Sequence, residues 1–371
     1  MTKIILCIDG LGKDMLTKEN MPFLYSFGRE NSVSRLKTLF AFTGIEYSFF
    51  TGKTPEESGV WLEFIYSKDS IFNNLILKFF SLNKKFRDYV AGLLQLMKGR
   101  TWISGLHNIP RERIDYFDSS IKTGLWKLEF FQKRSFAFYK WPFFVTKNGK
   151  EKIRLVFRYE SDEKRLKRLM KDKGKEIYYA QLMSADKASH KFGKRSEKTK
   201  EILRKVDRML EFHITRILKE NKNTEIFIWS DHGFADIKNW IDLDRLLPRR
   251  EDYIYFIAGT TASFWFGKGK EKSKRIILRK IKKYKNIKIL DKKIARKYNI
   301  PISRKYGDLI LFLEKGNYFF PNFYQKNGKE KFLSMHGYPE NKELDGFLMT
   351  NSRNLKKKSL KIKEVRRILD D

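Results

Sequence analysis

The stretch Ile226-Phe-Ile-Trp-Ser-Asp-His-Gly233 joins a β-prone apolar run to two side chains that bind metal ions in many proteins. Residues 226–228 predict a buried strand, and Asp231 and His232 would stand on the loop that follows it. In open α/β sheets, the loops at the carboxyl ends of the strands line the crevice where ligands bind. An ordinary capped turn has the same local pattern, so the rest of the chain must decide between the two interpretations.

The same pattern of an apolar strand followed by a carboxylate begins the chain. Residues 4–8 predict a central parallel strand that ends at Asp9-Gly10. A helix follows over 20–30, with Asn20 as its cap and Pro22 in its first turn. Further on, strands alternate with helices, which is typical of an α/β fold with a mostly parallel sheet. The elements expected there are helices over 161–173 and 196–218, the second capped by Ser196, and strands over 177–183, 261–266, 307–313 and 345–349, the last being the final strand.

Residues 36–52 predict a strand that turns at Thr43-Gly44 into a short helix ending at Gly52. A hydroxyl group at the start of a helix lies beside free backbone N–H groups, which favour an anion. Thr43 therefore occupies a predicted phosphate-binding position.

The chain is interpreted as a single α/β domain over 1–371 with two insertions. Residues 60–136 interrupt the alternation and predict a cap, with amphipathic helices over 71–98 and a turn at 116–118. Those helices would pack on the core or, alternatively, lie on a lipid surface. Lysine-dense helices over 270–284 and 292–298 predict a smaller basic subdomain over 268–305, and residues 353–371 a basic helical tail.

The composition restricts the function without choosing it. The 79 Lys and Arg residues against 44 Asp and Glu residues leave a formal charge of +35, which favours anionic partners: a phosphorylated substrate, nucleic acid or an anionic membrane surface. The alternative is a lysine-rich bias spread over solvated faces. Cys7 is the only cysteine, so a disulfide framework and a thiolate metal cluster are excluded. The first residues do not form a signal peptide and no apolar run is long enough to span a membrane, so a cytoplasmic location is expected.

Acidic and histidine side chains gather at or near the predicted strand ends. Three of the five histidines belong to this set, whose members are Asp9, Asp186, His190, Asp231, His232 and His336. Neutral imidazole and carboxylate are the usual zinc ligands where thiolate is absent. Two groups of about three such ligands would hold two divalent ions roughly 4 Å apart, an arrangement that suits in-line displacement at phosphorus.

These motifs, in this order, resemble the type I phosphodiesterase/nucleotide pyrophosphatase family of the alkaline phosphatase superfamily. The resemblance rests on Asp9-Gly, Thr43 followed by residues 48–52, Pro55 to Gly59, Asp186 to Gly193, Ser230 to Gly233 and Met335 to Tyr338. It implies an alkaline-phosphatase-like core and two zinc ions, with manganese as the alternative. One zinc would be bound by Asp186, His190 and His336, and the other by Asp9, Asp231 and His232. Thr43 would be the covalent nucleophile beside the second zinc.

The chain departs from the family pattern after Thr43. The family commonly has a Pro-Asn-His-like run there, whereas this chain has Gly44-Ile-Glu-Tyr47, one residue shorter. An alignment without a gap would place Phe42 at the nucleophile position, and Ser48 is the alternative hydroxyl group. The Asn that often binds a phosphoryl oxygen is missing, and Ser58 replaces the His of the usual Pro-x-x-His-Gly. The sulfatase branch is disfavoured because its Pro-Ser-Arg-like context is absent.

The leading hypothesis is a two-zinc phosphodiesterase or nucleotide pyrophosphatase that acts on a small anionic, nucleotide-like substrate. Coordination to a divalent cation lowers the pKa of a threonine hydroxyl enough for it to attack phosphorus. A phosphomonoesterase or phosphoryl transferase on the same fold is the first alternative, because one metal site serves all three reactions. The second alternative is a catalytically inactive basic protein that binds nucleic acid or a membrane. The sequence does not specify an oligomeric state.

Overall fold

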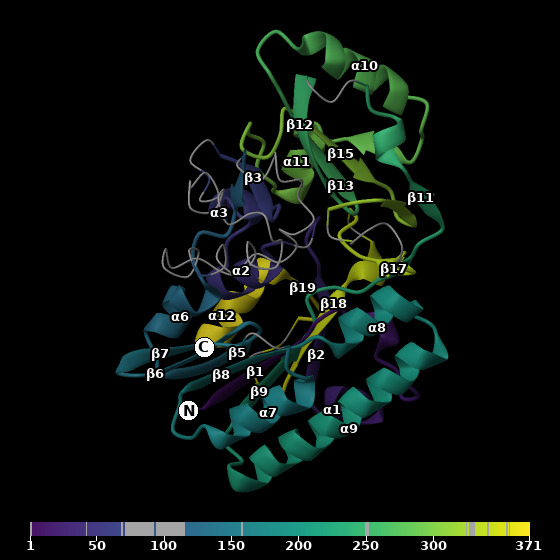
Figure 1. Cartoon of the computed structure of the whole chain (residues 1–371). Coiled ribbons are helices and arrows are strands. Elements are labelled where there is room, and N and C mark those ends of the chain that lie inside the picture. Colours follow the sequence, from purple (N-terminus) through teal and green to yellow (C-terminus); the bar gives the residue numbers. More distant parts are fainter. Residues whose placement is uncertain are drawn as a thin grey trace.

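A nine-stranded sheet forms the centre of the computed structural model (Figure 1). The structure describes residues 2–41, 43–67, 70, 93, 116–156, 159–248, 252–323, 325, 331–339, 341–353, 355 and 357–371. The strands follow the order β19-β2-β18-β9-β1-β8-β5-β6-β7, and only β18 and β6 run against the others. Their bounds are β1 Lys3–Ile8, β2 Ser32–Lys37, β5 Phe136–Lys140, β6 Phe143–Asn148, β7 Lys150–Leu155, β8 Ile177–Leu182, β9 Glu225–Trp229, β18 Gly346–Thr350 and β19 Ser359–Lys361. The predicted α/β fold with a mostly parallel sheet is confirmed.

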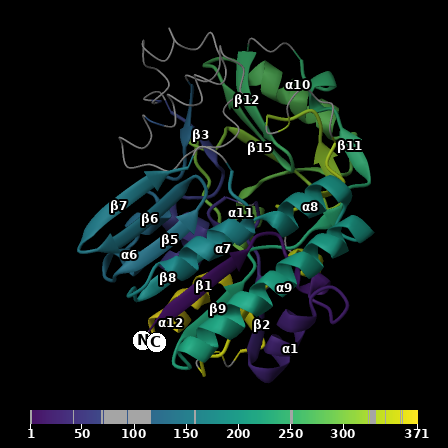
Figure 2. The same cartoon turned by 60° about the horizontal axis from the view of Figure 1, so that its bottom comes forward.

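Helices cover both faces of this sheet (Figures 1 and 2). Because successive side chains of a strand point to opposite faces, Ile4, Leu6 and Ile8 of β1 pack on one side and Ile5 and Cys7 on the other. The first face carries α1 Pro22–Glu30, α7 Asp162–Lys171, α8 Ser184–Phe192 and α9 Glu197–Glu220. The second carries α2 Ile45–Thr51, α6 Glu129–Gln132 and α12 Val365–Asp370.

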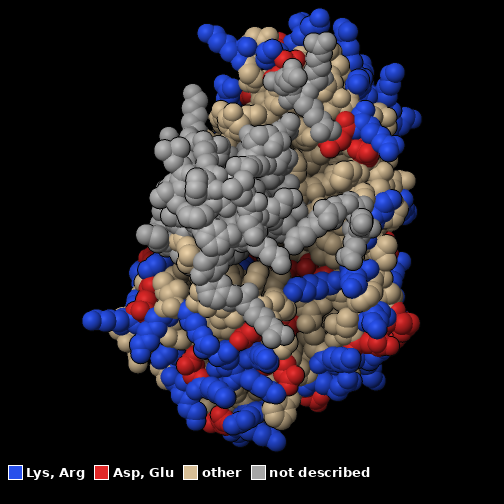
Figure 3. Space-filling model, in the orientation of Figure 1, with Lys and Arg blue, Asp and Glu red and all other residues tan. Residues whose placement is uncertain are grey.

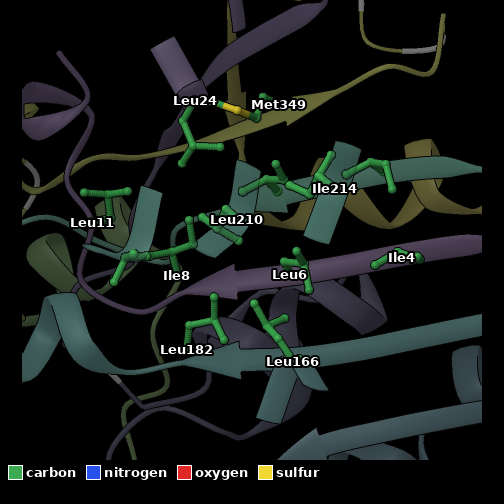
Figure 4. Packing of buried hydrophobic residues seen from close by; sticks show 14 of the residues in the cluster. Ile4, Leu6, Ile8, Leu11, Leu24, Leu166, Leu182, Leu210, Ile214 and Met349 are labelled. Atoms are coloured by element: carbon green, nitrogen blue, oxygen red, sulfur yellow. The ribbon is translucent and has the colours of Figure 1, made fainter. Parts of the chain in front are cut away.

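The core on the first face consists mostly of aliphatic side chains, some of which are drawn in Figure 4. Leu166 of α7 and Leu210 and Ile214 of α9 meet Leu6 and Leu182, all between 0% and 1% exposed. Burying each such side chain contributes about 1.5–3 kcal/mol. This packing holds β1, β8 and β9 in the middle of the sheet, so the loops at their carboxyl ends are anchored close together.

A second lobe is built on a four-stranded sheet in the order β12-β13-β15-β14 (Figure 2). Its strands are β12 Tyr253–Ala258, β13 Thr261–Phe266, β14 Ile287–Ile289 and β15 Leu309–Leu313, with α10 Glu271–Ile281 and α11 Lys292–Tyr298. The predicted basic insertion, 268–305, contains α10, β14 and α11, which pack with strands outside that range. Figure 3 shows Lys and Arg side chains over this lobe and over the lower half of the visible face.

The remaining elements are short. They are β3 Phe64–Tyr66, β4 Phe117–Ser119, β10 Ala235–Asp236, β11 Asn239–Ile241, β16 Asn317–Phe319, β17 Ser334–Met335 and α3 Pro55–Ser58, with 3-10 turns η1 Lys13–Met15, η4 Leu125–Lys127, η5 Leu243–Arg245, η8 Lys342–Leu344 and η9 Ile362–Glu364. The helices expected over 71–98 lie outside the described residues, apart from position 93. No helix in the described part of the chain is long and apolar enough to cross a membrane.

Several local predictions were wrong. Residues 116–118 contribute to strand β4 rather than a turn, and the strand before Thr43 is β2, which ends at Lys37. Asn20 does not cap α1, whose N-cap is Met21. The side-chain amide of Asn20 donates to the Met15 carbonyl instead. The tail, 353–371, is not one helix, because it contains strand β19 at the edge of the sheet and then η9 and α12. The strand expected to be the last one, 345–349, is therefore followed by another.

Candidate functional site

Asp9 stands at the carboxyl end of the central strand, β1. Its backbone N–H donates to the Leu182 carbonyl at 2.9 Å, and its side chain is almost fully buried. Gly10 follows with a φ of +71°, and a Cβ there would lie 2.6 Å from the ring of Phe234 and 2.9 Å from the Cα of Asp186. Only glycine permits this approach, which brings Asp9 beside the start of α8.

Asp231 and His232 follow β9, as predicted, and turn back toward Asp9. The Oδ1 of Asp231 accepts from the backbone N–H of Gly10 at 3.1 Å and of His232 at 3.0 Å. The Nε2 of His232 lies 3.5 Å from Asp9 Oδ1 and 3.5 Å from Asp231 Oδ2. Its Nδ1 lies 3.2 Å from the Gly233 carbonyl, an interaction that orients the ring with Nε2 toward the carboxylates.

Asp186 and His190 lie on a helix rather than at a strand end. β8 stops at Leu182, and α8 carries both residues one turn apart on one face, with 3.4 Å between His190 Nε2 and Asp186 Oδ1. The strand predicted over 177–183 is confirmed as β8, but it ends before Asp186, so the helix and not the strand carries both side chains. The Nδ1 of His190 lies 3.0 Å from the Ser334 carbonyl.

His336 lies between His190 and His232. It follows β17, and its Nε2 is 3.2 Å from His190 Nε2 and 3.8 Å from Asp186 Oδ1. Its ring also stacks on the ring of His232, with the centroids 3.7 Å apart. Four segments far apart in the sequence therefore contribute side chains to one cluster.

Two groups of side chains in this cluster bring their donor atoms within 4.8 Å of one another. One is Asp186, His190 and His336, the set that the sequence predicted for a first ion. The other is Asp9, His232 and again Asp186, whereas Asp231 was expected in its place. Asp186 thus connects the groups, and Asp231 adjoins the second through His232. The assignment of these residues as metal ligands stays a prediction.

The electrostatics of the cluster fit a divalent cation. Burial, together with the carboxylates of Asp231 and Asp186, raises the pKa of Asp9 well above its usual range. Burial, together with His232 and His190, lowers the pKa of His336 well below its usual range, and burial lowers the pKa of His190. Neutral imidazole and carboxylate that crowd together in this way are suitable zinc donors, and a cation would relieve the repulsion between the carboxylates.

The turn between β2 and α2, which carries Thr43, contacts the segment that bears His336. The neighbouring Ala41 donates its N–H to the carbonyl of Gly337, next to His336, at 3.2 Å. Gly44, the N-cap of α2, has a φ of +87°, and the Thr43 side chain is buried. The helix ends at Gly52, as predicted. Phe42 lies outside the described residues.

The sequence did not predict several polar residues on strands β5 and β8 and helix α2 that lie next to the cluster or near it. Gln181 of β8 donates to Asp9 Oδ2 at 2.6 Å. Glu46, in the first turn of α2, accepts from Lys140 at the end of β5 and from the hydroxyl of Tyr179. Gln181 could have been noticed in the sequence, because it is a polar residue inside the apolar strand 177–182. Lys140 follows an aromatic run, and no sequence signal marks it.

The chain has two other histidines, His107 and His213. His213 lies in the middle of α9, on the helical face that packs against α7, and burial lowers its pKa. It belongs to neither donor group. His107 lies outside the described residues.

The fold and the cluster together define an α/β protein with an acid-and-histidine centre at the carboxyl ends of its central strands, an alkaline-phosphatase-like architecture. Residues 3–339 match the family model described as type I phosphodiesterase/nucleotide pyrophosphatase, and the chain belongs to this family of enzymes. A search of curated proteins found no match.

Solved structures of ectonucleotide pyrophosphatase/phosphodiesterase 5 share the fold. The murine protein, alone and as an inactive threonine-to-alanine variant in complex with AMP, has a TM-score of 0.70 and 17% identity, covering 100% of this chain and 94% of that chain. The human protein has a TM-score of 0.68 and 16% identity, with the same coverage.

Proposed function

We propose that this protein hydrolyses a phosphodiester or pyrophosphate bond of a nucleotide-like substrate, with two zinc ions in its donor groups and Thr43 as the nucleophile. The observation that carries the proposal is the convergence of two donor groups that share Asp186. Asp186, His190 and His336 would hold one ion, and Asp9, Asp231 and His232 the other. Manganese is the alternative metal.

Bound divalent ions would supply Lewis acidity to the phosphoryl group and to the hydroxyl that attacks it. The Thr43 oxygen forms a bond to phosphorus, the bond to the leaving group breaks, and water then hydrolyses the phospho-threonine. Each step inverts the configuration at phosphorus, so the net result is retention. Gly44 caps α2 without a side-chain hydrogen bond, and the N–H groups of a helix's first turn favour the negative charge of a phosphoryl group.

The inactive murine variant that contains AMP has alanine in place of a threonine, which supports both the nucleophile and a nucleotide-like substrate. A cavity of about 350 Å³ lies at the start of α7, with Tyr159 and Lys164 in its lining. Lys187, next to Asp186 on α8, places its ammonium 3.0 Å from the centroid of the Tyr159 ring. Tyr159 therefore connects this cavity with the residue next to Asp186.

Nitrophenyl esters test the proposal. Zinc-loaded protein should release nitrophenol from a phosphodiester faster than from a phosphomonoester, and a chelator should abolish the release. Thr43→Ala should lower the rate at least ~100-fold. Thr51→Ala, on the same helix, is the matched control and should keep full activity. Activity that survives chelation would refute the metal centre. An unchanged Thr43→Ala rate would refute the nucleophile alone, and a preference for the monoester would favour a phosphomonoesterase.

A further inference from the structure

Lys194 is a buried lysine directly after the helix that carries Asp186 and His190. It follows Gly193, the C-cap of α8, and its side chain is only 1% exposed. A lysine is almost never buried to this extent unless its ammonium group is paired. Its partners therefore indicate why the chain has a cation at this position.

Three hydrogen bonds connect Lys194 to three other segments of the cluster. Its Nζ donates to Asp14 Oδ2 at 2.9 Å and to the Phe234 carbonyl at 2.8 Å. Its backbone N–H donates to Ser334 Oγ at 2.9 Å. Asp14 lies five residues after Asp9, Phe234 two residues after His232, and Ser334 two residues before His336. Lys194 itself lies four residues after His190.

Ser334 extends these contacts to the rings of the cluster. Its carbonyl accepts from His190 Nδ1 at 3.0 Å, and its hydroxyl donates to Asp236 Oδ1 at 2.7 Å. β17 and β10 pair here, with Ser334 opposite Asp236. A shift of Lys194 relative to Ser334 would therefore move His190 and His336 together.

We infer that Lys194 is a positioning residue of the metal centre, which holds the segments bearing Asp9, His190, His232 and His336 in register. The inference rests on the proposed metal site. Lys194 binds none of the donor atoms directly, so it acts through the loops that carry them. Partners of this kind, beyond the ligands themselves, commonly change metal affinity by 10–100-fold.

Whether removal of Lys194 weakens or strengthens metal binding distinguishes a positioning role from a purely electrostatic one. Lys194 carries a positive charge near a site for cations, so a purely electrostatic role predicts that its removal strengthens metal binding. Positioning predicts the opposite, because loops that are less well ordered hold the ligands less well. Lys194→Met removes the ammonium group and keeps most of the side-chain volume. Asp14 is 38% exposed, so water can solvate its carboxylate after the substitution.

The test is zinc affinity of the metal-stripped full chain, measured by competition with a chromophoric chelator. Lys194→Met should bind zinc about 10-fold more weakly than the wild type. Lys200→Met is the matched control, since Lys200 also pairs with a carboxylate of the N-terminal segment, Glu19, but only at the surface. It should leave zinc affinity unchanged. Asp14→Ala, which removes the partner instead, should weaken binding and provides a second variant if Lys194→Met does not fold.

The outcomes distinguish the inference from the function on which it rests. If the wild type binds no divalent ion, the proposed metal centre fails. If the wild type binds zinc and Lys194→Met binds it equally or more tightly, the positioning role of Lys194 is refuted and the metal centre stands. Cobalt in place of zinc adds a spectrum that is sensitive to ligand geometry, and a changed band shape in Lys194→Met, absent in Lys200→Met, would support positioning.

Discussion

The acid-and-histidine cluster and the turn that carries Thr43 lie at the same edge of the sheet but are held in different ways. The cluster rests on buried central strands, and its side chains are oriented by Gln181, Ser334 and backbone groups. The turn has Ala41 at a φ of 67° and Gly44 at 87°, in conformations that L-residues rarely adopt. The buried central strands therefore fix the position of the cluster. The conformation of the turn depends instead on contacts with distant segments such as Gly337 and Val60.

Removing His336 should have the largest effect, because it belongs to one donor group and its ring stacks on His232 of the other. His336→Ala is expected to lower zinc affinity at least ~100-fold and to abolish diesterase activity. Metal content after gel filtration and release of nitrophenol measure the two effects. His213→Gln, at a buried position outside the groups, should keep both. If His336→Ala retains two ions, the site is built from other residues.

Breaking the pair between Lys140 and Glu46 should have the next largest effect, on stability. Glu46 lies in the first turn of α2, and its side chain is 13% exposed. Lys140→Met leaves this carboxylate without its cation, which should cost about 3 kcal/mol of unfolding free energy. Chemical denaturation measures the loss. Lys133→Met breaks an exposed pair with Glu129 and should cost under about 1 kcal/mol. Equal losses in the two variants would contradict a stabilising role for the partly buried pair of Lys140 and Glu46.

Lys140 also shows what the sequence could not predict. The central strands β1 and β9 and the long helix α9 were predicted because apolar runs and the Ser196 cap are local signals. The strands β5, β6 and β7 were missed, since the aromatic run before Lys140 has no clear period and begins where the expected cap, 60–136, ends. The aromatic run forms strand β5 because it pairs with β8. This pairing brings Lys140 close enough to Asp9 for the two charges to interact.

The donor side chains were predicted more completely than their arrangement. Acidic and histidine residues after apolar runs are visible in the sequence, so the five members of the donor groups are among the six residues named, and their role as ligands stays a prediction. That Asp186 belongs to both groups was not predictable, because it depends on α8 turning its first residues toward Gly10. Likewise, β18 runs antiparallel between β2 and β9, a sheet position that no local pattern specifies.

A methyl group on Gly44 should disturb the turn without disturbing the cluster. In Gly44→Ala, the new Cβ would lie 2.7 Å from the Val60 carbonyl at a φ of +87°. The strain should cost about 2 kcal/mol and lower activity, while zinc content stays unchanged. Gly149→Ala has a similar φ of +79° with nothing within 4 Å, so it should cost only about 1 kcal/mol and keep activity. Loss of zinc from Gly44→Ala would show that the turn and the cluster are coupled.

Ser48→Ala should have the smallest effect and decides between the two hydroxyl groups. The Ser48 side chain is 1% exposed, and its Oγ has no hydrogen-bond partner in the described part of the chain. A hydroxyl enclosed in α2 is better suited to helix packing than to attack on phosphorus, and removing an unpaired buried hydroxyl should stabilise the fold slightly, by under about 1 kcal/mol. Diesterase activity should stay within twofold of the wild type. If instead Ser48→Ala is inactive while Thr43→Ala keeps its rate, the nucleophile is Ser48, and the turn at Gly44 serves only to start the helix.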